Sequence, residues 1–170
     1  VDFVITELKE LGFLIDMAKK GRQLRKTGQL LRRWVEAYPE NLKPKLVQEN
    51  FRTNTHNWWK DIKPADFDFF WGGEIAAAKL TGHLKPEKYT IYTDHLPGKL
   101  IYKFKFQKDP NGNVEFVTPF WTFGWELAEK KVVPPLLIYA DLMATGDARA
   151  IEAAEIIYDN HLTRLIREDR

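Results

Sequence analysis

The 170-residue chain contains no cysteine and no long uninterrupted apolar run. The absence of cysteine excludes disulfides, thiolate nucleophiles and cysteine-ligated zinc or iron–sulfur sites. Because no window approaches about 18 uncharged apolar residues, a membrane-spanning helix is not expected. The first thirty residues also lack the pattern of a secretory signal peptide, so we expect a cytoplasmic protein. The 4 histidines are scattered without zinc-ligand spacing, and neither a metal nor another cofactor is expected.

Apolar residues are nevertheless abundant, at 44% of the chain with 14% aromatic residues, which is enough to bury a core. A chain of this length forms one domain, or one small domain with an appendage. No internal repeat is found, so solenoid architectures are not supported.

The net charge of +2 hides an uneven distribution. Residues 1–60 carry 12 Lys and Arg against 7 Asp and Glu, whereas residues 61–170 carry 14 against 17. Between Asp16 and Glu36 there is no acid, and the segment forms either a phosphate-facing surface or a solvated basic face. Its basic residues are the candidate DNA-binding set: Lys19, Lys20, Arg22, Arg25, Lys26, Arg32 and Arg33.

The N-terminal pattern predicts a helix over residues 1–11, then a β-hairpin whose strands are 13–15 and 22–26. A second amphipathic helix follows around residues 31–38, with Thr27 as its N-cap and Pro39 closing it. This order is typical of a winged helix-turn-helix domain that lacks its first two helices, with the hairpin as the wing. Because the first residue is not Met, we expect upstream helices to be missing. The alternative is a generic αββα appendage.

The remainder predicts a mixed α/β domain that begins near residue 41. Strands are expected at 45–51, 67–71 and 89–93, and a hairpin is expected from 102–107 and 113–118. Helices are expected at 74–80, ended by Gly82, and from Pro135 to Met143. Asp147 should cap a last helix with a buried stripe of Ile151, Ala154, Tyr158, Leu162 and Leu165.

Gly72, Gly73 and Glu74 form a candidate ligand-binding group at the start of a helix. Backbone N–H groups there could hold an anion, and Glu74 could act as a general base. The alternatives are close backbone packing for the glycines and a favourable helix-dipole position for Glu74.

Asp66 and Asp68 form the one Asp-x-Asp pair of the chain. With Glu74 or Asp94 such a pair could hold magnesium for nucleotidyl transfer. A nucleotidyltransferase site would need the glycine pair first and the acids on the following strand, and here the order is reversed. A magnesium-dependent enzyme is therefore the second hypothesis.

Aromatic residues cluster in a way that fits either base stacking or core packing. They are Trp58, Trp59, Phe69, Phe70, Phe120, Trp121, Phe123 and Trp125. An exposed aromatic surface would instead favour a third hypothesis, a protein-interaction module.

Several motifs taken together are similar to a known family. They are Leu31–Tyr38, Trp71–Ala77, Leu80–Gly82, Thr90–Tyr92, Asp109–Val114, Pro134–Leu142 and Gly146–Arg149. The chain resembles the AbiEi-type transcriptional regulators, which are the antitoxins of type IV toxin–antitoxin (abortive infection) systems.

The resemblance implies an α+β protein in two parts. Residues 1–40 would be a partial winged helix that binds double-stranded operator DNA of its own operon, with its recognition helix within residues 1–11. Residues 41–170 would be an antitoxin domain that resembles a degenerate nucleotidyltransferase-like fold and ends in a helical pair. The resemblance further implies no catalysis, no stable complex with the toxin and no membrane contact, and DNA binding of this kind favours a homodimer.

Overall fold

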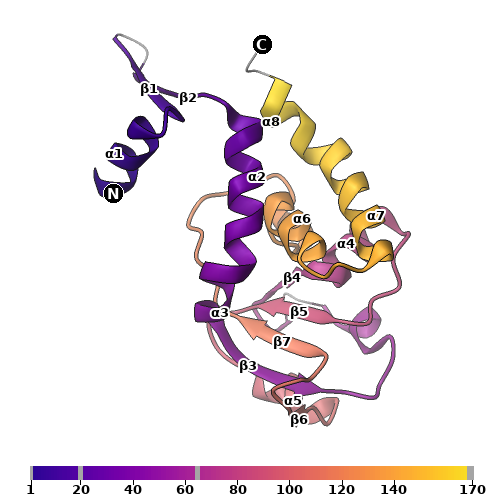
Figure 1. The fold of residues 1–170 in the computed structure, drawn as a ribbon. Coiled ribbons are helices and arrows are strands. Elements are labelled where there is room, and N and C mark those ends of the chain that lie inside the picture. The colour runs from indigo at the N-terminus through magenta and orange to yellow at the C-terminus, as the bar shows by residue number, and fades with distance from the viewer. Residues whose placement is uncertain (1, 19–20, 64–65, 168–170) are drawn as a thin grey trace.

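The computed structural model describes residues 2–18, 21–63 and 66–167 and shows a mixed α+β protein (Figure 1). The N-terminal elements are α1 (Asp2–Glu10), β1 (Leu14–Met17), β2 (Gly21–Leu24), α2 (Thr27–Ala37), the π-helical turn η1 (Tyr38–Leu42) and α3 (Lys43–Leu46). The central elements are β3 (Val47–Arg52), the 3₁₀ turn η2 (Trp58–Asp61), β4 (Phe70–Gly72), α4 (Gly73–Thr81), β5 (Tyr89–Tyr92), α5 (Gly98–Lys103), β6 (Gln107–Lys108) and β7 (Val114–Val117). The C-terminal elements are η4 (Ala128–Lys130), α6 (Pro135–Met143), α7 (Ala148–Ile157), the π-helical turn η5 (Tyr158–Leu162) and α8 (Thr163–Arg167).

The expected order of helix, hairpin and helix at the N-terminus is confirmed. Two details of the second helix differ from the prediction. Thr27 is its first residue rather than its cap, because Lys26 takes the N-cap position with a left-handed φ of 52°. The helical path does not stop at Pro39, because after α2 ends at Ala37 it continues through the π-helical turn η1 and α3.

The larger sheet has the strand order β4-β5-β7-β3-β6, in which β5 and β7 are parallel and the other pairs antiparallel. Helix α4 packs against β5, and α6 and α7 pack on α4 (Figure 1). Helix α2 lies along α6. The proposed boundary between residues 40 and 41 falls inside η1 and stays a prediction.

The predicted hairpin around Asp109–Asn113 is wrong. Tyr102 lies in α5, β6 has only two residues, and β3 separates β6 from β7. The loop crosses over β3 so closely that a Cβ on Gly112 would lie 1.9 Å from the Phe51 carbonyl oxygen. The turn residues carried a correct local signal, but strand pairing depends on β3, which lies more than fifty positions earlier in the chain.

The helix ends were predicted well, and the C-terminal stripe only in part. Gly82 ends α4 with a φ of 69°, and the Asp147 carboxylate accepts the Arg149 N–H as the cap of α7. Of the predicted stripe, Ala154 and Leu162 are buried, whereas Leu165 is exposed, since the π-helical turn η5 breaks the regular α-helical spacing before it. Within the described ranges, no helix is long and apolar enough to cross a membrane.

Candidate functional site

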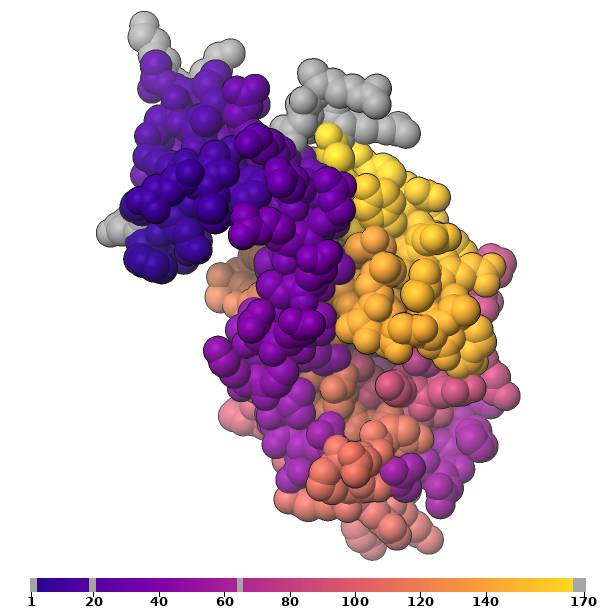
Figure 2. Space-filling model, viewed as in Figure 1, coloured from indigo at the N-terminus to yellow at the C-terminus, as the bar shows by residue number. Residues whose placement is uncertain are grey.

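The hairpin β1–β2 projects from the body of the molecule together with α1 (Figure 2). Its antiparallel register pairs Leu14 with Leu24 and Met17 with Gly21. Every residue of β2 is exposed, so its side chains are available to a partner. The hairpin is therefore an exposed element that projects from the body of the molecule.

Three of the predicted phosphate contacts lie exposed on or directly after this hairpin: Arg22, Arg25 and Lys26. Lys19 and Lys20 lie outside the described residues. Asp16 reduces the positive charge, because its carboxylate contacts Arg22 at 3.7 Å and Lys9 at 2.5 Å. The hydrogen bond from Lys9 lowers the pKa of Asp16, which stays ionised at neutral pH.

Arg32 and Arg33 are both exposed on α2, but their surroundings differ. The Arg33 guanidinium lies 5.6 Å from the centre of the Phe13 ring, a cation–π distance. Phe13 is only 2% exposed and begins the hairpin, and its carbonyl accepts the Arg25 N–H. Arg33 thus helps to hold the hairpin on α2, whereas Arg32 has no such contact among the described residues.

Helix α1, the helix expected within residues 1–11, offers little free positive charge. Its basic residue Lys9 is engaged by Asp16, and Glu7 and Glu10 are exposed acids. Phe3 and Val4 are exposed apolar residues on the same helix. Most of the positive charge of this part of the chain therefore lies on the hairpin and α2 rather than on α1.

The glycine pair is packed closely against the side chains of β5. A Cβ on Gly72 would lie 2.5 Å from the Tyr92 ring, and one on Gly73 would lie 2.9 Å from Thr90 Oγ1. Gly73 also has a left-handed φ of 47°. These contacts support the close-packing interpretation of both glycines.

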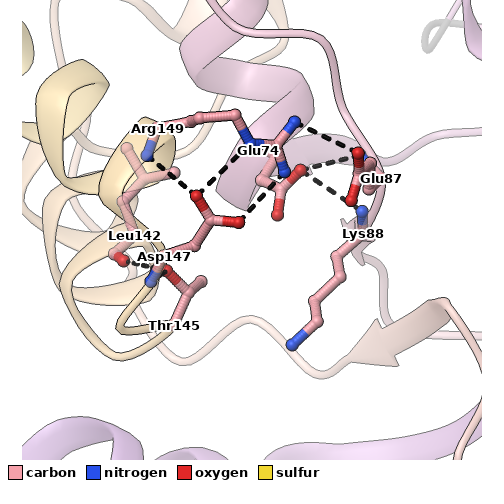
Figure 3. A network of polar contacts seen from close by, with 7 residues as sticks. All are labelled: Glu74, Glu87, Lys88, Leu142, Thr145, Asp147 and Arg149. Atoms are coloured by element: carbon pink, nitrogen blue, oxygen red, sulfur yellow. Dashed lines mark hydrogen bonds and ion pairs between the residues drawn. The ribbon is translucent and has the colours of Figure 1, made fainter.

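Glu74 is 6% exposed and fixes the loop before β5 (Figure 3). Its Oε2 accepts the backbone N–H groups of Glu87 and Lys88 at 2.7 and 3.3 Å. Arg149 reaches the same loop from α7, because it donates to the Glu87 carboxylate while bound to Asp147. The Oε2 atom of Glu74 therefore serves to hold the loop before β5 in place.

Gly73 and Glu74 also line a cleft of about 330 Å³ between the sheet and α6. Within this cleft the ammonium of Lys43 lies 2.5 Å from Glu115 Oε1 and 2.8 Å from Asp141 Oδ1. Thr90 donates to the same Glu115 oxygen at 2.8 Å. Burial acts to lower the pKa of Lys43, but the two carboxylates outweigh it and raise that pKa above its ordinary value. The cleft thus contains an internal ammonium held by two carboxylates.

Two buried tyrosines extend this network to the end of α2. Tyr92 donates to Asp141 Oδ2 at 3.1 Å, and the hydroxyls of Tyr38 and Tyr92 lie 2.6 Å apart. Burial and the negative charge of Asp141 raise the pKa of both hydroxyls, which therefore remain protonated. The polar network joins the helical rod α2–η1–α3 to the sheet and to α6.

The structure does not bring the predicted acids together. Asp66 and Asp68 are exposed in the segment before β4, and Asp94 lies beside an aromatic depression on the surface. None of the three lines the cleft of Lys43. Within the described part of the chain, no group of three or more Asp, Glu or His side chains could hold a metal ion.

The aromatic residues are divided between core and surface. Trp58, Trp59 and Phe69 are buried, as the core interpretation predicted. Phe120 and Phe123 are exposed in the loop that follows β7. Sequence reasoning thus located the core but could not tell which aromatic residues stay at the surface.

The central residues of the cleft were missed at the sequence level. Lys43, Glu115 and Asp141 have no shared motif, because 72 and 98 positions separate the lysine from its two partners. One signal was present, since Asp141 is an acid inside the otherwise apolar helix α6. Such a residue needs a buried partner, and a lysine is a natural one.

Comparison with known families identifies the class of protein. A family model of transcriptional regulators, described as "Transcriptional regulator, AbiEi antitoxin, Type IV TA system", matches residues 23–163. The chain therefore belongs to the AbiEi antitoxin family of type IV toxin–antitoxin systems. Comparisons with curated proteins and with solved structures found no match.

Proposed function

We propose that this chain is an autoregulating antitoxin that binds operator DNA and has no enzymatic activity. Residues 1–40 would bind the DNA as a partial winged helix, and residues 41–170 would form the antitoxin domain. Family membership supports the general role, and the exposed basic hairpin carries the DNA-binding part of the proposal.

The hairpin suits contact with a phosphate backbone. Arg22, Arg25 and Lys26 are exposed on or directly after the short hairpin. The hairpin projects into solvent at one end of the molecule (Figure 2). Lysine and arginine contacts to phosphate release counterions, so binding of this kind weakens steeply as salt rises. The phosphate contacts would fix the register and orientation of the protein on the DNA, while a helix in the groove, here α1, would recognise the bases.

A non-catalytic role fits the arrangement in the cleft. The Lys43 ammonium already lies between the carboxylates of Glu115 and Asp141 and forms an ion pair with each of them. The acid pair Asp66 and Asp68 lies elsewhere on the surface. Gly72 and Gly73 are explained by packing against β5.

The proposal includes a definite set of partners. Double-stranded operator DNA is the main partner, and a homodimer would read two half-sites. Neither a stable complex with the toxin nor a cofactor or membrane contact is proposed. The protein would act in the cytoplasm.

The test is binding of the chain to DNA from immediately upstream of its own gene, beside a scrambled duplex of equal length. Fluorescence anisotropy at two salt concentrations should show specific, salt-sensitive binding. The double variant Arg22→Ala/Arg25→Ala should weaken binding and reduce the salt slope by about 2.

The matched control is Lys85→Ala/Lys130→Ala, which removes the same charge from exposed lysines outside the hairpin. This control should bind as the wild type does. Equal affinity of the wild type and the arginine double variant would exclude the hairpin as the DNA contact. Equal affinity for the operator and the scrambled duplex would exclude sequence-specific regulation by this chain.

A further inference from the structure

A second basic surface lies at the end of the molecule opposite the hairpin, on α5 and the residues that follow it (Figure 1). Residues 95–108 contain four lysines and no acid. Lys99, Tyr102 and Lys103 are spaced by three and four positions, so they share one face of α5. Lys105 lies two residues beyond the end of α5, in a left-handed conformation with a φ of 53°. These four residues are called the α5 surface.

Tyr102 is 86% exposed, the largest exposed fraction among the large hydrophobic residues that the structure describes. The opposite side of α5 is anchored, because Leu100 is fully buried and Phe104 packs on Trp58 at 5.3 Å between ring centres. The tyrosine ring is therefore presented to solvent by a fixed support. Proteins that bind single-stranded nucleic acid combine aromatic rings, on which bases stack, with basic side chains that contact the phosphates.

The charges around the α5 surface leave it positive. Lys99, Lys103 and Lys105 are exposed, and within the described residues none of them forms an ion pair. The neighbouring acids are neutralised, since Glu49 pairs with Lys108 and Asp109 with Arg52, each at 2.5 Å. The adjoining depression of about 570 Å³ is lined by lysine, aromatic and uncharged residues without an acid.

We propose that the α5 surface binds single-stranded nucleic acid, with the lysines on consecutive phosphates and one base stacked on Tyr102. A duplex is a poorer partner, because its bases are already stacked on one another and cannot reach the ring. The proposal is independent of the hairpin, which lies at the other end of the molecule and has no comparably exposed aromatic ring on its strands.

The experiment titrates the full chain into fluorescein-labelled oligouridine of about 12 nucleotides and follows anisotropy at several salt concentrations. Tyr102→Ala should weaken binding about tenfold, and Tyr102→Phe should retain it, because phenylalanine also stacks. The triple variant Lys99→Ala/Lys103→Ala/Lys105→Ala should reduce the salt slope by about 2. All these side chains are exposed, so circular dichroism should show an unchanged fold.

The matched control is Lys45→Ala/Lys85→Ala/Lys130→Ala, which removes the same charge from other exposed positions and should leave binding intact. The hairpin variant Arg22→Ala/Arg25→Ala should also bind oligouridine normally, which separates this proposal from operator binding. Equal losses in the two lysine triples, or no effect of Tyr102→Ala, would overturn the proposal. So would binding of the α5 surface to phosphatidylserine vesicles without binding to oligouridine.

Discussion

Lys43 Nζ lies 2.8 Å from Asp141 Oδ1, an ion pair between residues 98 positions apart in the chain. The carboxylate is almost fully buried, and the ammonium comes from α3, the last part of the helical rod α2–η1–α3. The pair therefore fixes the base of the element that carries the hairpin.

Removal of the ammonium alone should lower the free energy of unfolding far more than removal of both charged groups. Lys43→Met leaves Asp141 buried without its counterion, and we expect a loss of about 3–5 kcal/mol in the free energy of unfolding. The double variant Lys43→Met/Asp141→Leu removes both charges and should recover a large part of this loss. Urea denaturation of the wild type, both single variants and the double variant measures the coupling.

An exposed ion pair gives the control for this cycle. Lys108 and Glu49 lie 2.5 Å apart at the surface, so Lys108→Met should change stability by no more than about 1 kcal/mol. If Lys43→Met lowers the free energy of unfolding no more than Lys108→Met does, the buried ion pair does not stabilise the attachment of the helical rod.

Addition of a single Cβ atom at Gly112 should strongly lower the stability of the protein. A Cβ there meets the Phe51 carbonyl oxygen at 1.9 Å, and backbone atoms cannot rotate away as a side chain does. Gly112→Ala should therefore destabilise the protein by about 3 kcal/mol or more. Gly98→Ala is the control, since nothing lies within 4 Å of its added Cβ, and its thermal midpoint should stay near that of the wild type.

The cap of α7 predicts a dependence on pH. The hydrogen bond from Arg149 holds the pKa of Asp147 below its ordinary value of 3.8. A carboxyl with a lowered pKa in the folded state stabilises that state above pH 3.8 and loses this effect as pH falls through the folded pKa. Asp147→Asn keeps a capping oxygen but not the charge, and Asp147→Ala keeps neither.

At neutral pH the thermal midpoints should therefore fall in the order wild type, Asp147→Asn, Asp147→Ala. As the pH is lowered below 3.8, the difference between the wild type and Asp147→Asn should disappear. The difference between the two variants should persist, because it reflects the capping oxygen. A gap between wild type and Asp147→Asn that is the same at every pH would contradict the assigned ion pair.

The features that the sequence predicted correctly depend on neighbours within a few positions. Gly82 ends α4 and Asp147 caps α7 because both effects involve the adjacent turn of helix. The hairpin β1–β2 was predicted for the same reason, since its strands lie close together in the sequence. Local signals thus gave most element positions and the mixed α+β class.

The errors concern contacts between distant segments. Strand β3 lies between β6 and β7, and no signal in Asp109–Asn113 indicates that a third strand occupies this place. The charged centre of the cleft could not be predicted for the same reason, because only the folded structure brings Lys43 and Glu115 together. Sequence patterns singled out Gly73 and Glu74, which line this cleft, but indicated neither the cleft nor its charged centre.

Arg32 and Arg33 provide the last prediction, because two adjacent arginines on α2 should have different roles. Both are exposed cations, so Arg32→Ala and Arg33→Ala should each weaken DNA binding through loss of charge. Only Arg33→Ala also removes the cation–π contact with Phe13, worth about 0.5–1 kcal/mol at an exposed site.

The hairpin of Arg33→Ala should therefore open more often. Hydrogen exchange followed by NMR should show faster exchange of the Arg25 amide, which bonds to the Phe13 carbonyl, in Arg33→Ala than in Arg32→Ala. Equal exchange rates in the two variants would show that Arg33 does not position the hairpin.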